Sequence, residues 1–216
     1  MSFTLKQFEI GPMQNFCYLI GDHKSKQAFV VDPAWNPEEI LSTVEKEGFR
    51  LAGFLISHAH YDHTNAIEDL LDKVDVPVYA NKAEMDYAKS GNSIVGSLGR
   101  TAKTTNAEES LQLGETEIKV LHTPGHTPGS QCFQVGDYLI TGDTLFIGGC
   151  GRSDLPGGNP ATLFKSLQKI ARLPTQLTIC PGHDYGSVKQ RTLGEEKGEN
   201  PYLQMTDEKT FIQTAS

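Results

Sequence analysis

Residues 51–63 read Leu51-Ala52-Gly53-Phe54-Leu55-Ile56-Ser57-His58-Ala59-His60-Tyr61-Asp62-His63. The apolar first half predicts a buried strand, and the second half places four metal-capable side chains directly after it. In an extended segment His58 and His60 point to the same side, because side chains repeat every two residues. Asp62 and His63 follow where the chain has to turn, which places them to face a second ion. This stretch therefore predicts two adjacent metal positions rather than one closed structural site.

The composition of the chain restricts its class and its partners. Its 216 residues carry a formal net charge of −8, which argues against a nucleic-acid-binding surface. No apolar run is long enough to span a bilayer, and residues 1–10 lack the apolar core of a signal peptide. The four cysteines are scattered, which is typical of reduced thiols: Cys17, Cys132, Cys150 and Cys180. We therefore expect a single cytoplasmic domain over residues 1–216, with no nucleic-acid or membrane partner.

The order of the expected elements indicates an α/β protein. Alternating or continuous apolar residues predict strands at residues 3–10, 16–21, 28–32, 51–57, 76–80, 117–121, 131–135, 138–141 and 177–180. Caps and apolar faces at helical spacing predict helices at residues 37–46, 64–71, 82–89, 160–173 and 187–193. Residues 90–110 are rich in Gly, Ser, Thr and Asn and are interpreted as a surface loop, and the residues after 193 as a polar tail. Strands followed by helices in each half suggest a layered sandwich.

Three later segments repeat the design of the first, in which a strand ends in a metal-capable residue beside glycine or proline. They are Leu121-His122-Thr123-Pro124-Gly125-His126-Thr127-Pro128-Gly129, Ile140-Thr141-Gly142-Asp143 and Ile179-Cys180-Pro181-Gly182-His183-Asp184-Tyr185. Glycine lets the backbone approach a metal closely, and proline stiffens the loop that carries the ligand. His23, at an expected hairpin turn, is interpreted as a surface residue, and His122 as a hydrogen-bonding neighbour of His126.

This succession of motifs resembles the metallo-β-lactamase superfamily of metallohydrolases. The order is His-x-His-x-Asp-His, Thr-Pro-Gly-His-Thr-Pro-Gly-Ser, Thr-Gly-Asp and Pro-Gly-His, and it extends over roughly residues 15–190. The resemblance implies a four-layer αββα sandwich. It also implies a ligand set of two metal positions with one bridging carboxylate: His58, His60 and His126 for the first, Asp62, His63 and His183 for the second, and Asp143 between them.

The resemblance implies chemistry as well as ligands. Two divalent ions, zinc in the first place and iron or manganese as alternatives, would convert a shared water into a hydroxide that attacks a carbonyl. Asp62 would orient or deprotonate this nucleophile besides binding metal. A structural zinc site is the competing interpretation, but such sites are closed by four ligands and are rich in cysteine.

A segment further along the chain indicates which branches of the superfamily the chain resembles. Gly149-Cys150-Gly151-Arg152-Ser153-Asp154 resembles the Gly-x-Gly-Arg-x-Asp segment of two groups, the short glyoxalase II-like thioester hydrolases and the persulfide dioxygenases. Arg152 is a candidate for binding a substrate carboxylate, although a local pair with Asp154 would equally explain it. The further candidate substrate contacts are Tyr185, Arg191 and Lys197.

The favoured function is a dinuclear hydrolase that cleaves a thioester, S-2-hydroxyacylglutathione or a similar acyl-thiol, by a metal-bridging hydroxide. The first alternative is a persulfide dioxygenase with a single iron on His58, His126 and Asp143, acting on glutathione persulfide. The second is a hydrolase of acyl-carrier or coenzyme A thioesters. It stays open because 33 residues follow His183, too few for the helical extension that contacts glutathione in full-length glyoxalase II. A non-catalytic metal-binding module is disfavoured by the complete ligand set.

Overall fold

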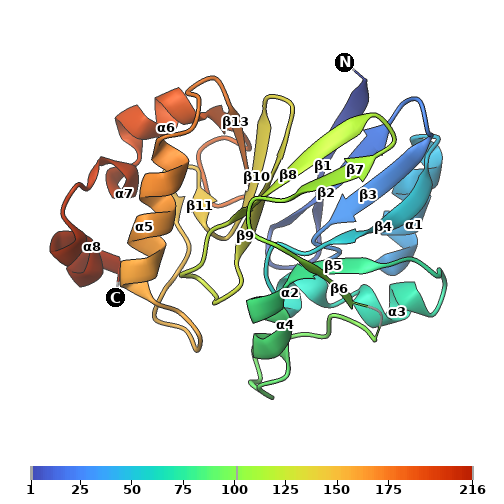
Figure 1. The fold of residues 1–216 in the computed structure, drawn as a ribbon, viewed down its shortest axis with the longest axis horizontal. Coiled ribbons are helices and arrows are strands. Elements are labelled where there is room, and N and C mark those ends of the chain that lie inside the picture. Colours follow the sequence, from blue (N-terminus) through green and yellow to red (C-terminus); the bar gives the residue numbers. More distant parts are fainter. Residues whose placement is uncertain (1, 101, 216) are drawn as a thin grey trace.

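Two six-stranded sheets face each other at the centre of the protein, and helices cover their outer sides (Figure 1). The structure is a computed structural model that describes residues 2–100 and 102–215. This mixed α/β arrangement confirms the layered sandwich expected from the sequence. Within the described residues, none of the helices has the length and apolar character needed to cross a membrane.

The first sheet has the strand order β1-β2-β3-β4-β5-β6. Its strands are β1 (Phe3–Ile10), β2 (Asn15–Asp22), β3 (Gln27–Val31), β4 (Arg50–Leu55), β5 (Val78–Asn81) and β6 (Ala102–Thr105). The first three strands pair in antiparallel fashion, and β3 to β6 pair in parallel. The helices of this half are α1 (Pro37–Lys46), α2 (Tyr61–Thr64), α3 (Ile67–Leu71) and α4 (Lys82–Ala88).

The second sheet has the order β14-β13-β10-β9-β8-β7. Its strands are β7 (Ser110–Leu113), β8 (Thr116–His122), β9 (Gln131–Val135), β10 (Tyr138–Gly142), β13 (Thr178–Pro181) and β14 (Arg191–Thr192). A short hairpin of β11 (Leu145–Phe146) and β12 (Gly149–Cys150) forms a separate two-stranded sheet. The helices of this half are α5 (Pro160–Ala171), α6 (Leu193–Glu199), α7 (Pro201–Gln204) and α8 (Glu208–Ala215).

Three clusters of buried apolar side chains fill the spaces between the four layers. Strand β2 contributes to two of them. Cys17 and Leu19 belong to the cluster under α1 and α3, whereas Tyr18 and Ile20 belong to the cluster between the sheets. The two-residue period of a strand produces this alternation when both of its faces are covered.

Helix α5 follows directly from its sequence. The side chain of Asn159 accepts a hydrogen bond from Thr162 N at 2.9 Å, and proline is well suited to the first turn that follows such a cap. Leu163, Leu167 and Ile170 are spaced to form one face of the helix, and all three are fully buried in the remaining cluster, which lies under α5. The helix therefore closes the outer face of the second sheet.

Two expectations about irregular regions are wrong. Residues 90–110 contain β6, which pairs in parallel with β5 and forms the edge of the first sheet. Residues 187–193 form no helix, because β14 occupies residues 191 and 192 and α6 begins only at Leu193. The polar tail is helical in α6, α7 and α8, and Phe211 of α8 is fully buried against α5.

Candidate metal centre

The loops that follow the parallel strands of the two sheets meet at one edge of the sandwich. Strands β3 and β4 are parallel, and so are β10 and β13. The carboxyl ends of parallel strands lie at the same edge of a sheet, so the residues that follow them come together. Asp32 follows β3, His58 follows β4, Asp143 follows β10 and His183 follows β13. A backbone hydrogen bond from Gln131 N to Ser57 O, 2.9 Å long, ties the two edges together at this point.

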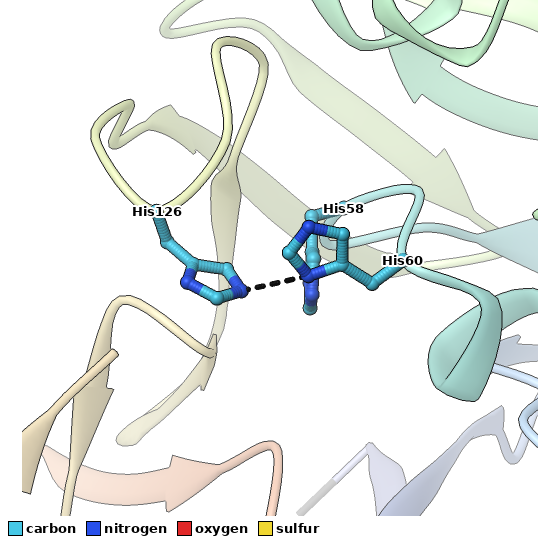
Figure 2. A group of neighbouring side chains, drawn as sticks. All are labelled: His58, His60 and His126. Carbon is cyan, nitrogen blue, oxygen red and sulfur yellow. Dashed lines mark hydrogen bonds between the residues drawn. The ribbon is translucent and has the colours of Figure 1, made fainter. Parts of the chain in front are cut away.

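Three histidines form the first group, defined as His58, His60 and His126, and their imidazoles converge (Figure 2). One ring nitrogen from each lies within 4.8 Å of the others, and all three side chains are buried. His126 Nε2 stands 3.0 Å from His60 Nδ1. Two nitrogens on one tetrahedral zinc ion, each about 2.1 Å from it, are roughly 3.4 Å apart. The spacing of the first group therefore suits a shared ion.

Asp62, His63 and His183 form the second group, in which a carboxylate takes the place of one imidazole. His63 Nε2 lies 3.1 Å from His183 Nε2, and His183 Nε2 lies 3.4 Å from Asp62 Oδ2. Asn15, which is fully buried, donates a hydrogen bond from Nδ2 to Asp62 Oδ2 at 3.1 Å. Trp35 Nε1 in turn donates to Asn15 Oδ1 at 3.1 Å, so the Asp62 carboxylate is held by a chain of two hydrogen bonds.

Asp143 lies between the two groups. Its Oδ2 is 3.6 Å from His126 Nε2 in the first group and 3.4 Å from His183 Nε2 in the second. Its Oδ1 is 3.3 Å from His63 Nε2. The structure therefore brings all seven side chains that the sequence singled out to one place, with a carboxylate in reach of both halves.

Backbone oxygens orient two of the imidazoles. His126 Nδ1 lies 2.7 Å from Arg152 O, and His183 Nδ1 lies 2.9 Å from Met13 O. A carbonyl oxygen only accepts hydrogen bonds, so each Nδ1 carries a proton, and in the neutral imidazole each Nε2 has a lone pair. That lone pair faces the centre of its group, which is the arrangement that metal-binding histidines adopt.

The carboxylate of Asp32 orients two further imidazoles, one in each group. Asp32 Oδ2 accepts a hydrogen bond from His63 Nδ1 at 3.1 Å and from Ser57 Oγ at 2.6 Å. Because Ser57 donates to Asp32, its oxygen is free to accept from His58 Nδ1 at 3.0 Å. In its neutral form each imidazole is thereby left with an Nε2 lone pair for the centre.

Three buried polar atoms in the centre have no hydrogen-bond partner: His58 Nε2, His60 Nε2 and Asp143 Oδ1. In residues 2–100 and 102–215 no other buried side-chain nitrogen or oxygen is in this position. Leaving such an atom unpaired costs about 1–3 kcal/mol. His60 faces His126 through Nδ1, so His58 Nε2 and Asp143 Oδ1 are the two of these atoms that call for a partner in the centre. The donors are imidazole nitrogens and carboxylate oxygens, which suit zinc, iron and manganese. The residues present therefore fit a metal centre.

Burial and charge make the two groups electrostatically different. Burial lowers the pKa of His58 well below its usual range and lowers the pKa of His60 to about 3. Burial also acts on His183, but the carboxylates of Asp143 and Asp62 outweigh it and raise the pKa of His183 to about 9. His58 and His60 are therefore neutral near pH 7, whereas an ion that enters the second group has to displace a proton.

A cavity of about 230 Å³ opens over the centre. Both groups contribute to its floor, and its walls are mostly apolar or aromatic: Met13, Tyr61, Ile94, Arg152, Leu155 and Tyr185. The Tyr185 ring stacks on the His183 imidazole with 4.5 Å between ring centroids. The Arg152 guanidinium makes two hydrogen bonds to the Asp154 carboxylate, at 2.9 and 2.7 Å. This is the local ion pair that the sequence offered as an alternative role for Arg152.

Comparison with known proteins agrees with this geometry. The sequence pattern of the metallo-beta-lactamase superfamily matches residues 10–183. The chain belongs to the metallo-beta-lactamase superfamily. Relatives in that superfamily include the probable polyketide biosynthesis zinc-dependent hydrolase PksB of Bacillus subtilis, 30% identical over 92% of this chain and 85% of its own length. A hydroxyacylglutathione hydrolase of Alkalilimnicola ehrlichii is 34% identical over 88% of this chain and 69% of its own length.

Solved structures of the superfamily extend the comparison. The crystal structure of ETHE1 from Myxococcus xanthus matches with a TM-score of 0.84 and 28% identity, over 98% of this chain and 89% of that chain. Together with the hydroxyacylglutathione hydrolase, it supports the glyoxalase II-like and persulfide dioxygenase-like branch that the sequence indicated.

Some of the residues considered from the sequence do not line the cavity over the metal centre. Arg191 and Lys197, two candidate substrate contacts, are not among its lining residues, and Arg191 Nη1 is paired with Glu199 at 2.6 Å. His23 Nε2 instead bonds Thr4 Oγ1 at 2.8 Å, and His122 Nε2 bonds Pro128 O at 3.1 Å. His122 therefore contacts the loop that carries His126. Arg191 and Lys197 do not line the cavity, and their contact with a substrate stays a prediction.

Three residues that hold the metal centre together were not predicted from the sequence: Asn15, Asp32 and Glu84. Asp32 had a usable signal, since it ends an apolar strand and precedes Pro33, as the other candidate residues end theirs. Asn15 and Glu84 had none, because one begins a strand and the other sits in a helix of ordinary composition. Their roles come from contacts between distant segments.

Proposed function

We propose that the protein is a dinuclear metal-dependent hydrolase that cleaves a thioester, S-2-hydroxyacylglutathione or a similar acyl-thiol. The observation that carries the proposal is Asp143, whose Oδ2 lies within 3.6 Å of an imidazole nitrogen from each group. The similarity to a hydroxyacylglutathione hydrolase and to a zinc-dependent hydrolase supports hydrolysis as the reaction class. Zinc is the proposed metal, and iron and manganese accept the same donors.

The proposed ligands are the seven side chains of the centre, with Asp143 shared between the two positions. Two divalent ions, when bound there, lower the pKa of a water and polarise the thioester carbonyl. Burial raises the pKa of Asp62, but His63 and the hydrogen bonds from His183 and Asn15 outweigh it and hold that pKa well below its usual range. Asp62 therefore stays ionised and is suited to bind metal and to orient the attacking water.

The walls of the cavity bear on the substrate. Met13, Ile94 and Leu155 offer apolar surface to an acyl chain or to the carbons next to sulfur. Arg152 is the one lysine or arginine among these lining residues. Asp154 pairs with its Nε and Nη2, so Nη1 is the nitrogen left to bind a substrate carboxylate. The proposed glutathione contact is therefore made by Arg152 Nη1, and Tyr185, which stacks on His183, is the second proposed contact.

A thioester of an acyl carrier or of coenzyme A is the second candidate substrate. The similarity to PksB, a probable polyketide biosynthesis enzyme, and the apolar walls of the cavity both favour it. The proposal further places the protein in the cytoplasm, which the four free cysteine thiols support because they suit a reducing compartment.

One paired experiment tests the proposed function. Protein purified without chelator is analysed for metal content, and the same sample is assayed for S-lactoylglutathione hydrolysis and for oxygen uptake with glutathione persulfide. We expect two metal ions per chain and thioester cleavage. One iron per chain with oxygen uptake and no thioester cleavage would instead establish the persulfide dioxygenase. Cleavage of acyl-coenzyme A but not of S-lactoylglutathione would transfer the activity to the second candidate substrate.

A further inference from the structure

Glu84 is a buried carboxylate that contacts two separate metal-binding loops without binding metal itself. Its side chain is fully buried on α4, and no lysine, arginine or histidine forms an ion pair with it within the described part of the chain. Burial raises its pKa, although three hydrogen bonds oppose the shift. A buried charge without a counterion is costly, so the hydrogen bonds that it receives indicate what the carboxylate is for.

The hydrogen bonds of Glu84 divide between the two loops of the first group. Oε1 accepts from the backbone N–H of Ala59 at 2.6 Å, and Ala59 stands between His58 and His60. Oε2 accepts from Thr127 Oγ1 at 2.7 Å and from Gly129 N at 2.8 Å, both within three residues after His126. The two oxygens of one carboxylate thus join the loops that supply all three imidazoles.

The loop that carries His126 is also pressed against the helices on both sides. A Cβ added to Gly129 would stand 2.2 Å from Glu84 N and 2.5 Å from Glu84 Cβ, so only glycine permits this approach to α4. A Cβ added to Gly125 would stand 2.3 Å from Leu163 N and Cα in α5. The Glu84 carboxylate therefore acts across a backbone contact that has no room to adjust.

We propose that Glu84 is a positioning residue that sets the distance between the His58–His60 loop and the His126 loop, and so the metal affinity of the first group. The inference rests on the proposed metal centre and is independent of the substrate. A glutamine at this position offers one acceptor oxygen and one NH₂, so the NH₂ faces either the Ala59 N–H or the Gly129 N–H. One of the two loops then loses its anchor.

The test compares Glu84→Gln with Asp86→Asn, which makes the same change of charge on the same helix. The Asp86 side chain is exposed and pairs with Lys82 Nζ at 3.1 Å. Both changes are made in the His183→Ala background, so that Co²⁺ titration of metal-free protein reports mainly the first group. We expect Glu84→Gln to weaken Co²⁺ affinity about 10–100-fold and to alter the visible Co²⁺ spectrum, and Asp86→Asn to change neither.

Two further measurements keep the test decisive. Circular dichroism melting of the metal-free variants shows whether Glu84→Gln folds. If it does not, Thr127→Val removes one hydrogen bond to Oε2 with little change of shape, and we expect a several-fold loss of Co²⁺ affinity. A folded Glu84→Gln protein with unchanged Co²⁺ affinity and spectrum would overturn the inference, even if the parent protein hydrolyses thioesters. Weakened Co²⁺ binding in a protein that cleaves no thioester would support Glu84 and refute the proposed function.

Discussion

The two halves of the centre differ in charge, although they lie side by side. The first group consists of imidazoles, and burial keeps His58 and His60 neutral. The second group contains the Asp62 carboxylate, and neighbouring carboxylates raise the pKa of His183 to about 9. Neutral imidazoles accept an ion without giving up protons, whereas the second group exchanges protons for metal. Burial therefore keeps the imidazoles of the first group neutral and ready to bind a metal ion, whereas in the second group the carboxylates supply negative charge that attracts the ion.

The change with the largest expected effect removes the link between the halves. In Asp143→Asn the side chain keeps its shape but loses the charge that faces both groups. We expect both metal affinities to fall and kcat for thioester cleavage to drop on the order of 10³-fold, the scale known for a lost electrostatic contact in an active site. Metal analysis and steady-state kinetics measure the two quantities. Retention of two tightly bound ions would show that Asp143 is not shared.

Single ligand deletions separate the two halves. His183→Ala is expected to bind one metal ion instead of two, because the first group keeps its three imidazoles. The loss in kcat should lie roughly between 10² and 10³, since half of the charge stabilisation at the carbonyl disappears. His60→Ala is the matched change in the first group. One metal ion per chain in both the parent protein and His183→Ala, with equal activity, would mean that the second group holds no ion.

Asn15 tests whether the hydrogen bond to Asp62 matters. Asn15→Leu keeps the branched shape of the side chain but removes the donor at 3.1 Å from Asp62 Oδ2 and the acceptor of Trp35 Nε1. We expect the affinity of the second group to fall about 10–100-fold, as when other partners of metal ligands are removed, with the first group unaffected. Competition titration with a chromophoric chelator resolves the two steps. A loss confined to the first group would reverse the assignment of Asp62.

The smallest expected effect is a difference in pH dependence. A raised pKa means that His183 carries a proton near neutral pH, so metal binding at the second group weakens as the pH falls below about 9. Each pH unit costs about tenfold in affinity per proton displaced. The lowered pKa of His60, about 3, means that no such competition arises in the first group between pH 9 and pH 5. Metal content after dialysis at stepwise lower pH should therefore drop from two to one; simultaneous loss of both ions would contradict the comparison.

The parts of the structure that the sequence predicts are those in which local pattern and tertiary role agree. The strand before His58 is apolar because it is buried, and the ligands follow strand ends because parallel strands end at one edge. Strand β6 was missed because residues 102–105, Ala-Lys-Thr-Thr, lie at the sheet edge and carry no apolar alternation. Its pairing with β5 is a long-range contact that leaves no local pattern.

The errors near the C-terminus have a different cause. Thr192 and Glu195 form a capping box that begins α6. This local signal marks a helix start at residue 193, whereas the predicted helix at 187–193 ended there. Helix α8 has a low apolar content, and its one fully buried side chain, Phe211, is explained only by its contact with Phe164. Glu84 is the same case within the centre, since its partners lie 25 to 45 residues away in the chain.

The central claim is that two metal positions share Asp143, and anomalous X-ray scattering from crystals of the zinc-loaded protein tests it most directly. The account predicts two peaks roughly 3.5–4 Å apart, one beside the first group and one beside the second. Asp143 should lie between them, with an oxygen toward each. A single peak beside His58, His126 and Asp143, unchanged when excess zinc is supplied, would contradict the dinuclear centre and with it the proposed hydrolase.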